Sequence, residues 1–311
     1  MEQTLSPEEL RELIRLARKA LWSDVETKKA IQASGVNVIP ANFYSTVPGM
    51  EEIENSFEYA AGADTEIYND TGLFDAEKIG DFLETIRPYA REFDPPLEAD
   101  ETDGFYWKNP AFSFSDAMAY YCVIRHFKPK EIVEIGAGYS TLVADMALKR
   151  NGGGSITVIE PYPKAFLAGL QSVREIIESP VQEISLERLV ALIDRCDLCF
   201  IDSTHTVKIG SDCLWIYLKV LPCVSTETVV HVHDVYLPFG FAKTHAMNLH
   251  IYWTEQYLLY AYMLDNPRVE VLYGNAFATR KLPGELAGLM GDKYPVGNGA
   301  SLWFALKGRR P

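Results

Sequence analysis

The rhythm of apolar and polar positions changes near residue 130 of the chain. Beyond that point, short apolar runs alternate with stretches in which apolar residues recur at helical spacing. The apolar runs predict seven strands, at 131–135, 155–159, 175–178, 198–202, 228–233, 268–273 and 301–306. The amphipathic stretches between the first five predict helices at 140–150, 163–171, 185–193 and 210–220. This alternation is typical of an α/β fold with a parallel sheet and crossover helices.

The end of the chain breaks this alternation. Residues 274–300 contain glycine and proline and show no clear helical pattern, so we expect the last two strands to form an antiparallel pair. Earlier strands, such as LCFI at 198–201, are apolar throughout. Continuous apolar strands indicate a sheet that is covered by helices on both faces.

Residues 1–104 do not show the alternation of strand and helix patterns seen in the rest of the chain. Ser6-Pro7-Glu8-Glu9 is a helix start signal, 76–93 is a second amphipathic stretch, and Ser115-Asp116 predicts the cap of a third helix. Pro95-Pro96 and the acidic EADETDG after them predict a linker. We therefore expect an N-terminal helical cap over 1–104 and a second domain over 105–311. The first helix carries an apolar stripe, which would pack on the rest of the chain or on a second copy in a homodimer: Leu10, Leu13, Ile14, Ala17 and Leu21.

Composition narrows the class of protein. The 311 residues carry a net charge of -14 and are 48% hydrophobic, so we expect a packed globular protein that binds neither nucleic acid nor anionic membranes. No apolar run approaches the about 20 residues of a membrane helix, and MEQTLSPEELREL does not have the order of a signal peptide. We expect a cytoplasmic protein. Cys196 and Cys199 have a C-x-x-C spacing, but they precede an apolar strand and have no second pair, which disfavours a redox or zinc site.

Candidate ligand-binding residues follow the first two strands. Gly136-Ala137-Gly138 separates a strand from a helix, and glycine there lets the backbone approach a ligand at a helix N-terminus. Glu160 follows the second strand, 26 residues beyond Glu134, where an acid accepts hydrogen bonds from ribose hydroxyls. A surface turn at Glu160-Pro161 is the other interpretation. Together the two features favour a nucleoside ligand.

The kind of nucleoside follows from two departures from the dinucleotide pattern. Thr141 stands where the third glycine of G-x-G-x-x-G would be, and Glu134 would repel a pyrophosphate. A carboxylate at this place suits a ligand with an ammonium group. The residues therefore favour S-adenosyl-L-methionine over NAD, and leave a nicotinamide dehydrogenase as the disfavoured alternative.

Several segments resemble class I S-adenosylmethionine-dependent methyltransferases: VEIGAGYSTL (133–142), TVIEPYP (157–163), FIDSTHTVKIGSD (200–212) and VHVHDVYLPFGF (230–241). The resemblance covers about 105–311 and is strongest with bacterial small-molecule methyltransferases of biosynthetic clusters. It implies a Rossmann-like sheet of seven strands. It also implies a set of cofactor contacts. Glu134, Gly136 and Gly138 would hold the methionine moiety, Glu160 would bind the ribose, and Gln182 would lie near the adenine. Ser140 departs from a common glycine and is a further candidate contact, as is Asp202.

A second cluster combines acids and histidines at strand ends. Asp202 and Asp234 close the predicted fourth and fifth strands, with His205 and His233 beside them. Two carboxylates and one or two imidazoles suit a divalent cation: magnesium or manganese for the carboxylates, and manganese, iron or zinc where imidazole joins them. Related magnesium-dependent O-methyltransferases place acids at these two strand ends, but the histidines do not come from that resemblance.

Two other interpretations of this cluster stay open. One is a general base without metal, for which His233, His205 and Asp202 are the candidate catalytic residues. The other is a purely structural role. His245 and His250, farther on, are expected at the surface or in packing contacts.

The sequence therefore predicts an enzyme that transfers a methyl group from S-adenosyl-L-methionine to a small-molecule acceptor, by O-methylation and with or without a metal. Aromatic residues at 105–107 and 236–257 are candidates for the acceptor pocket or a lid over it. A cyclase or lyase that uses the same cofactor and a non-catalytic binding module are the alternatives.

Overall fold

The computed structural model describes residues 4–99, 104–112, 114–291, 295–296 and 299–309. The chain divides into two compact units, Met1–Ser56 and Phe57–Pro311. The boundary expected at 104 therefore does not coincide with this division, and a functional cap over 1–104 stays a prediction. Most of the predicted acidic linker lies outside the described residues. Within the described residues, no helix combines the length and the apolar character that crossing a membrane requires.

The first unit consists of three helices, α1 (Pro7–Leu21), α2 (Val25–Ala33) and α3 (Met50–Glu54). As expected, α1 starts at a capping box in which the Ser6 hydroxyl accepts from the Glu9 amide and the Glu9 carboxylate accepts from the Ser6 amide. None of the α1 residues is buried, and Leu13 in the apolar stripe is 53% exposed. Coverage of this stripe by a second copy stays a prediction.

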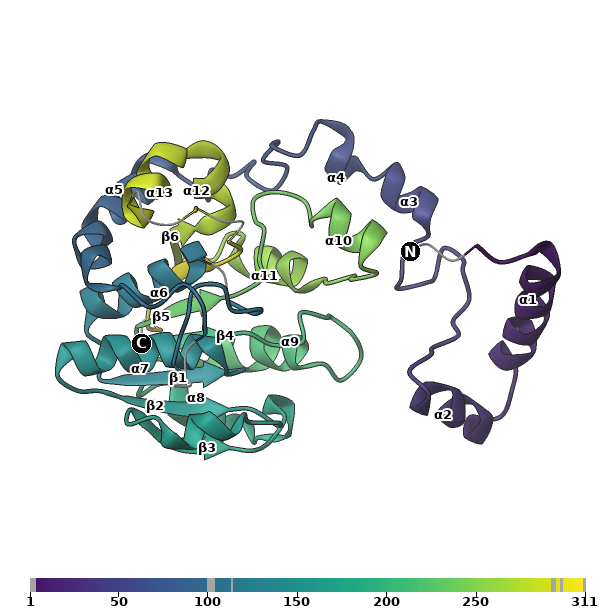
Figure 1. Ribbon diagram of the computed structural model, residues 1–311, viewed down its shortest axis with the longest axis horizontal. Helices are drawn as coiled ribbons and strands as arrows, with labels where there is room; N and C mark the ends of the chain where they lie inside the picture. Colours follow the sequence, from purple (N-terminus) through teal and green to yellow (C-terminus); the bar gives the residue numbers. More distant parts are fainter. Residues whose placement is uncertain (1–3, 100–103, 113, 292–294, 297–298, 310–311) are drawn as a thin grey trace. The chain divides into compact units, whose positions relative to one another are not determined.

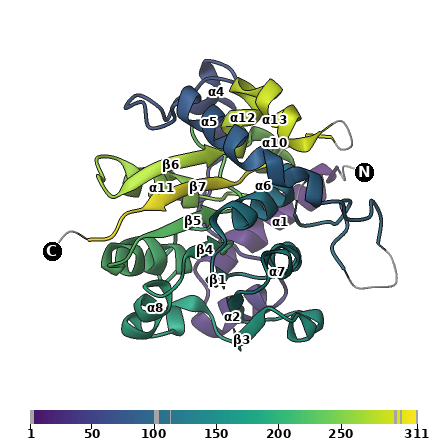
Figure 2. The same cartoon turned by 90° about the vertical axis from the view of Figure 1, so that its left-hand side faces the viewer.

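The second unit contains the predicted seven-stranded sheet, in the order β3-β2-β1-β4-β5-β7-β6 (Figures 1 and 2). All neighbouring strands are parallel except β7, which runs antiparallel to both β5 and β6. The expected antiparallel end of the sheet is thus confirmed. The strands are β1 (Glu131–Ile135), β2 (Ser155–Ile159), β3 (Val173–Ile177), β4 (Leu198–Ile201), β5 (Thr228–Val232), β6 (Val269–Gly274) and β7 (Leu302–Leu306).

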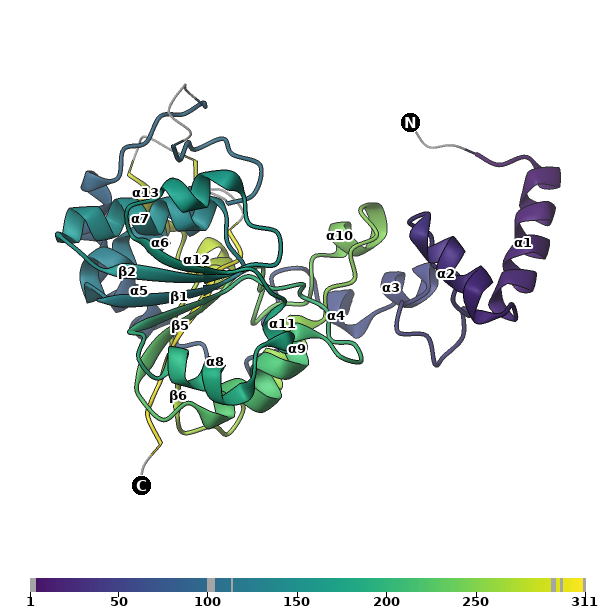
Figure 3. The ribbon, with the colours of Figure 1, turned by 90° about the horizontal axis from the view of Figure 1, so that it is seen from below.

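Helices cover both faces of the sheet. On one face lie α5 (Ala76–Ile86), α6 (Phe114–Phe127) and α7 (Tyr139–Asn151), and on the other lie α8 (Leu186–Ile193), α9 (Asp212–Trp215) and α11 (Glu255–Met263) (Figures 2 and 3). This double cover explains why β4 and β5 consist of buried residues throughout. The remaining helices are α4 (Phe57–Ala60), α10 (Lys243–Asn248), α12 (Asn275–Lys281) and α13 (Pro283–Met290).

Three predicted elements need correction. The helix expected at 163–171 is only a 3₁₀ turn, Ala165–Gly169. The helix expected at 76–93 ends at Ile86 and continues as a 3₁₀ turn, because Pro88 has no amide hydrogen to donate. The segment 274–300, predicted without a helix, contains α12 and α13. Proline was taken there as a breaker, but Pro283 occupies the first position of α13, where its missing amide costs nothing.

Candidate functional site

The glycine turn after β1 lies against the end of β4. Gly136 has a φ of 84°, and its amide donates to the Ile159 carbonyl. A Cβ at this position would lie 2.0 Å from the carbonyl oxygen of Asp202, so only glycine fits. A Cβ on Gly138 would meet no protein atom within 4 Å. The turn is therefore packed on one side and open on the other, as a ligand-binding turn before the N-terminus of α7 requires.

Glu134 lies beneath this turn and is 0% exposed. Its carboxylate accepts hydrogen bonds from the Tyr120 hydroxyl at 2.8 Å and the Thr141 hydroxyl at 2.6 Å. Thr141, which replaces the third glycine of the dinucleotide pattern, also accepts from the Gly138 amide at 3.1 Å. Glu134 thus holds the turn through Thr141. A direct contact with an ammonium group stays a prediction.

The burial of Glu134 predicts a pH-dependent effect of Glu134→Gln. Burial raises the pKa of Glu134 to about 7, against the opposing hydrogen bonds from Thr141 and Tyr120. The folded protein therefore disfavours the carboxylate, and the cost grows as pH rises from the unfolded pKa of about 4.3 to about 7. Relative to wild type, the glutamine variant should gain about 2 kcal/mol of unfolding free energy between pH 5 and pH 8. Urea denaturation at both pH values measures this, and a pH-independent difference would contradict it.

The other predicted cofactor contacts gather at the same edge of the sheet. Glu160 is half-buried at the end of β2, where its carboxylate accepts from the Tyr162 amide at 2.9 Å. Gln182 is exposed in the 3₁₀ turn that follows β3, and Ser140 is buried in the first turn of α7. Their roles toward a cofactor stay predictions, but parallel strands do bring their ends together here.

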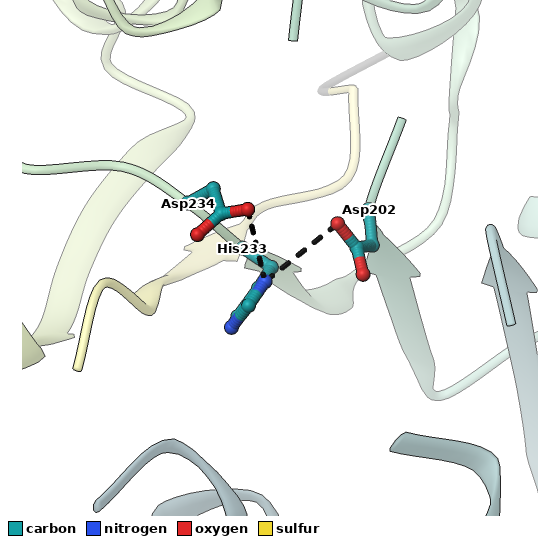
Figure 4. Close-up of side chains that lie close together, drawn as sticks. All are labelled: Asp202, His233 and Asp234. Atoms are coloured by element: carbon teal, nitrogen blue, oxygen red, sulfur yellow. Dashed lines mark ion pairs between the residues drawn. The ribbon is translucent and has the colours of Figure 1, made fainter. Parts of the chain in front are cut away.

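The four residues predicted as metal ligands converge next to this turn. The Nδ1 atom of His233 lies 3.6 Å from Asp202 Oδ1 and 3.7 Å from Asp234 Oδ2 (Figure 4). These three residues offer ligand atoms within 4.8 Å of one another. His205 lies beside them, with Nε2 3.2 Å from Asp202 Oδ1 and 3.5 Å from Asp234 Oδ2. Both His205 and Asp234 have positive φ, of 58° and 57°, which is uncommon outside glycine and clusters at functional sites.

Each histidine has a buried carboxylate at the nitrogen that points away from the cluster. His205 Nδ1 lies 2.7 Å from Glu255 Oε2, and the Tyr217 hydroxyl donates to Glu255 Oε1 at 2.6 Å. His233 Nε2 lies 3.4 Å from Asp116 Oδ2. Neither acid was predicted from the sequence as part of the site. Asp116 was predicted as part of a helix cap, but it lies inside α6, where an acid among apolar residues was the available signal.

The charges of the cluster shift the pKa values of its members. Burial would raise the pKa of Asp202, but His233 and His205 hold it well below its usual range. Burial would lower the pKa of His205, but Asp202 and Glu255 raise it to about 10. Burial raises the pKa of Asp234, although both histidines oppose this. The cluster is therefore a set of interacting charges in which both histidines are buried and both carboxylates are half-buried.

Three further histidines differ in their exposure to solvent. His231 is buried and stacks on Trp303 at a ring distance of 4.0 Å, and burial holds its pKa well below its usual range. His245 is half-buried against Tyr236, and His250 is exposed. Two residues of the early aromatic cluster, Phe105 and Trp107, belong to the core. Tyr106, the middle residue of that cluster, has its hydroxyl 3.2 Å from the hydroxyl of Tyr139, the first residue of α7 after the glycine turn.

Comparison with known proteins gives the following likenesses. The sequence model of a family described as "Methyltransferase domain" matches residues 133–235. An uncharacterized protein of Archaeoglobus fulgidus is 35% identical over 156 residues, which cover 47% of this chain and 70% of that protein.

Solved structures that resemble the chain include three methyltransferases. They are the O-methyltransferase TomG from Streptomyces achromogenes with bound SAM (16% identity, 73% of this chain and 90% of that chain, TM-score 0.37), the plantazolicin methyltransferase BpumL with SAH (14%, 84% and 100%, 0.40) and an O-methyltransferase from Bacillus cereus with SAH (14%, 77% and 95%, 0.35).

The open glycine turn, the acid after β2 and the order of the sheet define an α/β protein that binds a nucleoside cofactor. Together with the family match over the β1–β5 region, they identify the type of enzyme. The chain belongs to the class I S-adenosylmethionine-dependent methyltransferases.

Proposed function

We propose that this methyltransferase acts on a hydroxyl oxygen of a small molecule and uses a divalent cation held by Asp202, His233 and Asp234, with His205 beside it. One observation carries the proposal. The Nδ1 atom of His233 is buried and has no hydrogen-bond partner among the described residues, yet it faces two carboxylates at 3.6 and 3.7 Å. These distances are too long for hydrogen bonds. They suit ligands arranged around a shared cation.

The carboxylates at the far nitrogens support this assignment. Metal-binding histidines usually donate their other ring nitrogen to a carboxylate, which fixes the tautomer and the orientation of the ring. Glu255 stands in this position for His205 at 2.7 Å, so that the lone pair at His205 Nε2 is directed into the cluster. Asp116 Oδ2 lies 3.4 Å from His233 Nε2, which makes no hydrogen bond among the described residues, and a donation there on metal binding would direct the His233 Nδ1 lone pair the same way. A mixed set of carboxylate and imidazole ligands favours manganese or iron over magnesium.

The chain places this cluster beside the cofactor turn. The Asp202 amide donates to the Ile135 carbonyl at 2.8 Å, and the Asp202 carbonyl lies directly against Gly136. A bound cation would lower the pKa of an acceptor hydroxyl and orient it for in-line attack. The position of Asp202 would bring such a hydroxyl next to the methyl donor. Glu160 and the open face of Gly138 would hold that donor.

A metal-free general base is the second candidate. His205 is poorly suited to this role, since Glu255 occupies its Nδ1 at 2.7 Å and Asp202 lies 3.2 Å from its Nε2. His233 remains the one imidazole of the cluster with a nitrogen free to accept a proton, so its replacement separates the two mechanisms. The resemblance to enzymes of biosynthetic clusters supports a small hydroxylated metabolite as the acceptor.

Calorimetric titration of the metal-free protein with Mn²⁺ tests the proposal. Wild type should bind one Mn²⁺ per chain at micromolar levels, because two carboxylates and an imidazole nitrogen face one point. His233→Ala should weaken binding by about 10- to 100-fold, on the scale of lost metal-site contacts. His250→Ala, which alters an exposed histidine, is the matched control and should bind like wild type. A wild type that ignores Mn²⁺, or a His233→Ala variant with unchanged affinity, would contradict the metal site.

A further inference from the structure

A cavity of about 330 Å³ lies between the loop that follows β5 and helix α12. Its volume is at the lower end of the range for small-molecule sites. Polar side chains from α10, α12 and the β5 loop contribute to the wall, together with backbone near β7: Tyr236, Thr244, His245, Thr279, Arg280 and Gly299. Among the described lining residues, Arg280 alone has a permanent charge.

Arg280 is held in place but only partly neutralised. Its guanidinium lies 4.0 Å above the centre of the Phe239 ring, and its Nε atom is 3.2 Å from Asp64 Oδ1. The Asp64 side chain is 81% exposed, so water screens that ion pair and it contributes little. The stacked guanidinium is positioned to recognise a planar anion through two parallel hydrogen bonds. Such a cation in a cavity wall is notable in a chain with a net charge of -14.

The cavity adjoins the acid–histidine cluster. Tyr236 in its wall follows Asp234 by two residues. On another side, Gly299 precedes Ala300, whose amide donates to Asp116, the carboxylate behind His233. The Trp253 ring also connects the two places, with ring distances of 4.4 Å to His205 and 6.3 Å to His245. A small acceptor with its hydroxyl at the cluster would extend into this cavity.

We propose that the cavity binds a carboxylate of the acceptor, so that the substrate class is a small hydroxylated carboxylic acid. Arg280 supplies the charge and the fork of donors, and Thr244 and Thr279 line the same cavity. The inference rests on the proposed function, because it extends the same site. It also predicts which part of the acceptor determines selectivity.

Two probes that share a dihydroxyphenyl ring, one with a carboxylate and one with a neutral carboxamide, test this inference. They are 3,4-dihydroxybenzoate and 3,4-dihydroxybenzamide, titrated calorimetrically into protein saturated with S-adenosylhomocysteine and Mn²⁺, and assayed as acceptors with S-adenosylmethionine. Wild type should bind the acid about 10- to 100-fold more tightly than the amide, as expected for a charge-assisted contact. Arg280→Met should abolish this preference, and Arg280→Lys should restore part of it. Arg188→Met removes an exposed arginine that pairs with Glu175, and should leave the preference unchanged.

The outcomes separate the inference from the proposed function. If the acid binds through Arg280 but neither probe is methylated, the acid site stands and the proposed acceptor chemistry fails. If both probes are methylated equally well and Arg280→Met changes nothing, the acid site fails and the proposed function stands. A wild type that binds neither probe, or binds both equally, overturns the inference even where Arg280→Met does not fold. Preference for a phosphate analogue over the carboxylate also overturns it.

Discussion

Asp234→Asn should reduce methyl transfer by about a thousandfold or more while it changes affinity for S-adenosylhomocysteine less than about threefold. The substitution keeps the shape of the side chain but removes its charge. Asp234 Oδ2 faces His233 Nδ1 across 3.7 Å and lies after β5, whereas the predicted cofactor contacts that close a strand lie mainly after β1, β2 and β3. Loss of this carboxylate should therefore weaken the cation and spare the cofactor.

Transfer of a labelled methyl group, measured on an acceptor that wild type accepts, checks this result together with calorimetry of the cofactor product. Asp265→Asn is a matched control, because Asp265 is an exposed aspartate that also has a positive φ, of 51°. It should behave like wild type in both measurements. An Asp234→Asn variant with normal transfer would show that this carboxylate takes no part in the reaction.

Gly136→Ala should be the most destabilising glycine substitution in the turn. The new Cβ would lie 2.0 Å from the Asp202 carbonyl oxygen, and the φ of 84° adds strain for any residue with a Cβ. Because the two nearest atoms, the carbonyl oxygen and carbonyl carbon of Asp202, belong to the backbone, relief requires β1 and β4 to separate at their ends. We expect a loss of about 4 kcal/mol or more, or no soluble protein.

Gly152→Ala is the control that carries the backbone strain without the steric contact. Gly152 ends α7 with nearly the same φ, of 86°, but a Cβ there meets no atom within 4 Å. Its substitution should cost only about 1–2 kcal/mol of backbone strain. Thermal denaturation of both variants should give a melting temperature about 5 °C or more lower for Gly136→Ala. Equal melting temperatures would show that the turn does not press against β4 as described.

The strands were predictable from the sequence because each is an apolar run with little polar interruption. LCFI at 198–201 is buried at every position, so its pattern reports the double cover directly. The lateral order of the strands depends on contacts between distant segments, so local patterns do not show it and it was not predicted; the resemblance to methyltransferases implied only a Rossmann-like sheet of seven strands. Helices α12 and α13 were not predicted, because proline and glycine occur both in loops and at helix starts, and Pro283 occupies the first position of α13.

The candidate site was only half predictable. Asp202 and Asp234 were found because acids after parallel strands meet at one edge. Asp116 and Glu255 were missed because their roles depend on contacts across the fold, and no spacing in the sequence relates Glu255 to His205, 50 residues away. Glu134 shows the same limit in another form. Its position was predicted correctly, but its bond to Thr141, which accepts from the Gly138 amide, shows a role in holding the turn.

Methyl transfer by chelator-treated enzyme tests the metal-assisted mechanism most directly. The enzyme is stripped of metal, assayed with labelled S-adenosylmethionine and an accepted hydroxylated acid, and assayed again after addition of Mn²⁺. The ligand set of Asp202, His233 and Asp234 predicts that the stripped enzyme loses activity, still binds S-adenosylhomocysteine, and recovers transfer with Mn²⁺. Full activity of the stripped enzyme, combined with complete loss in His233→Ala, would contradict the metal site and leave His233 as a general base.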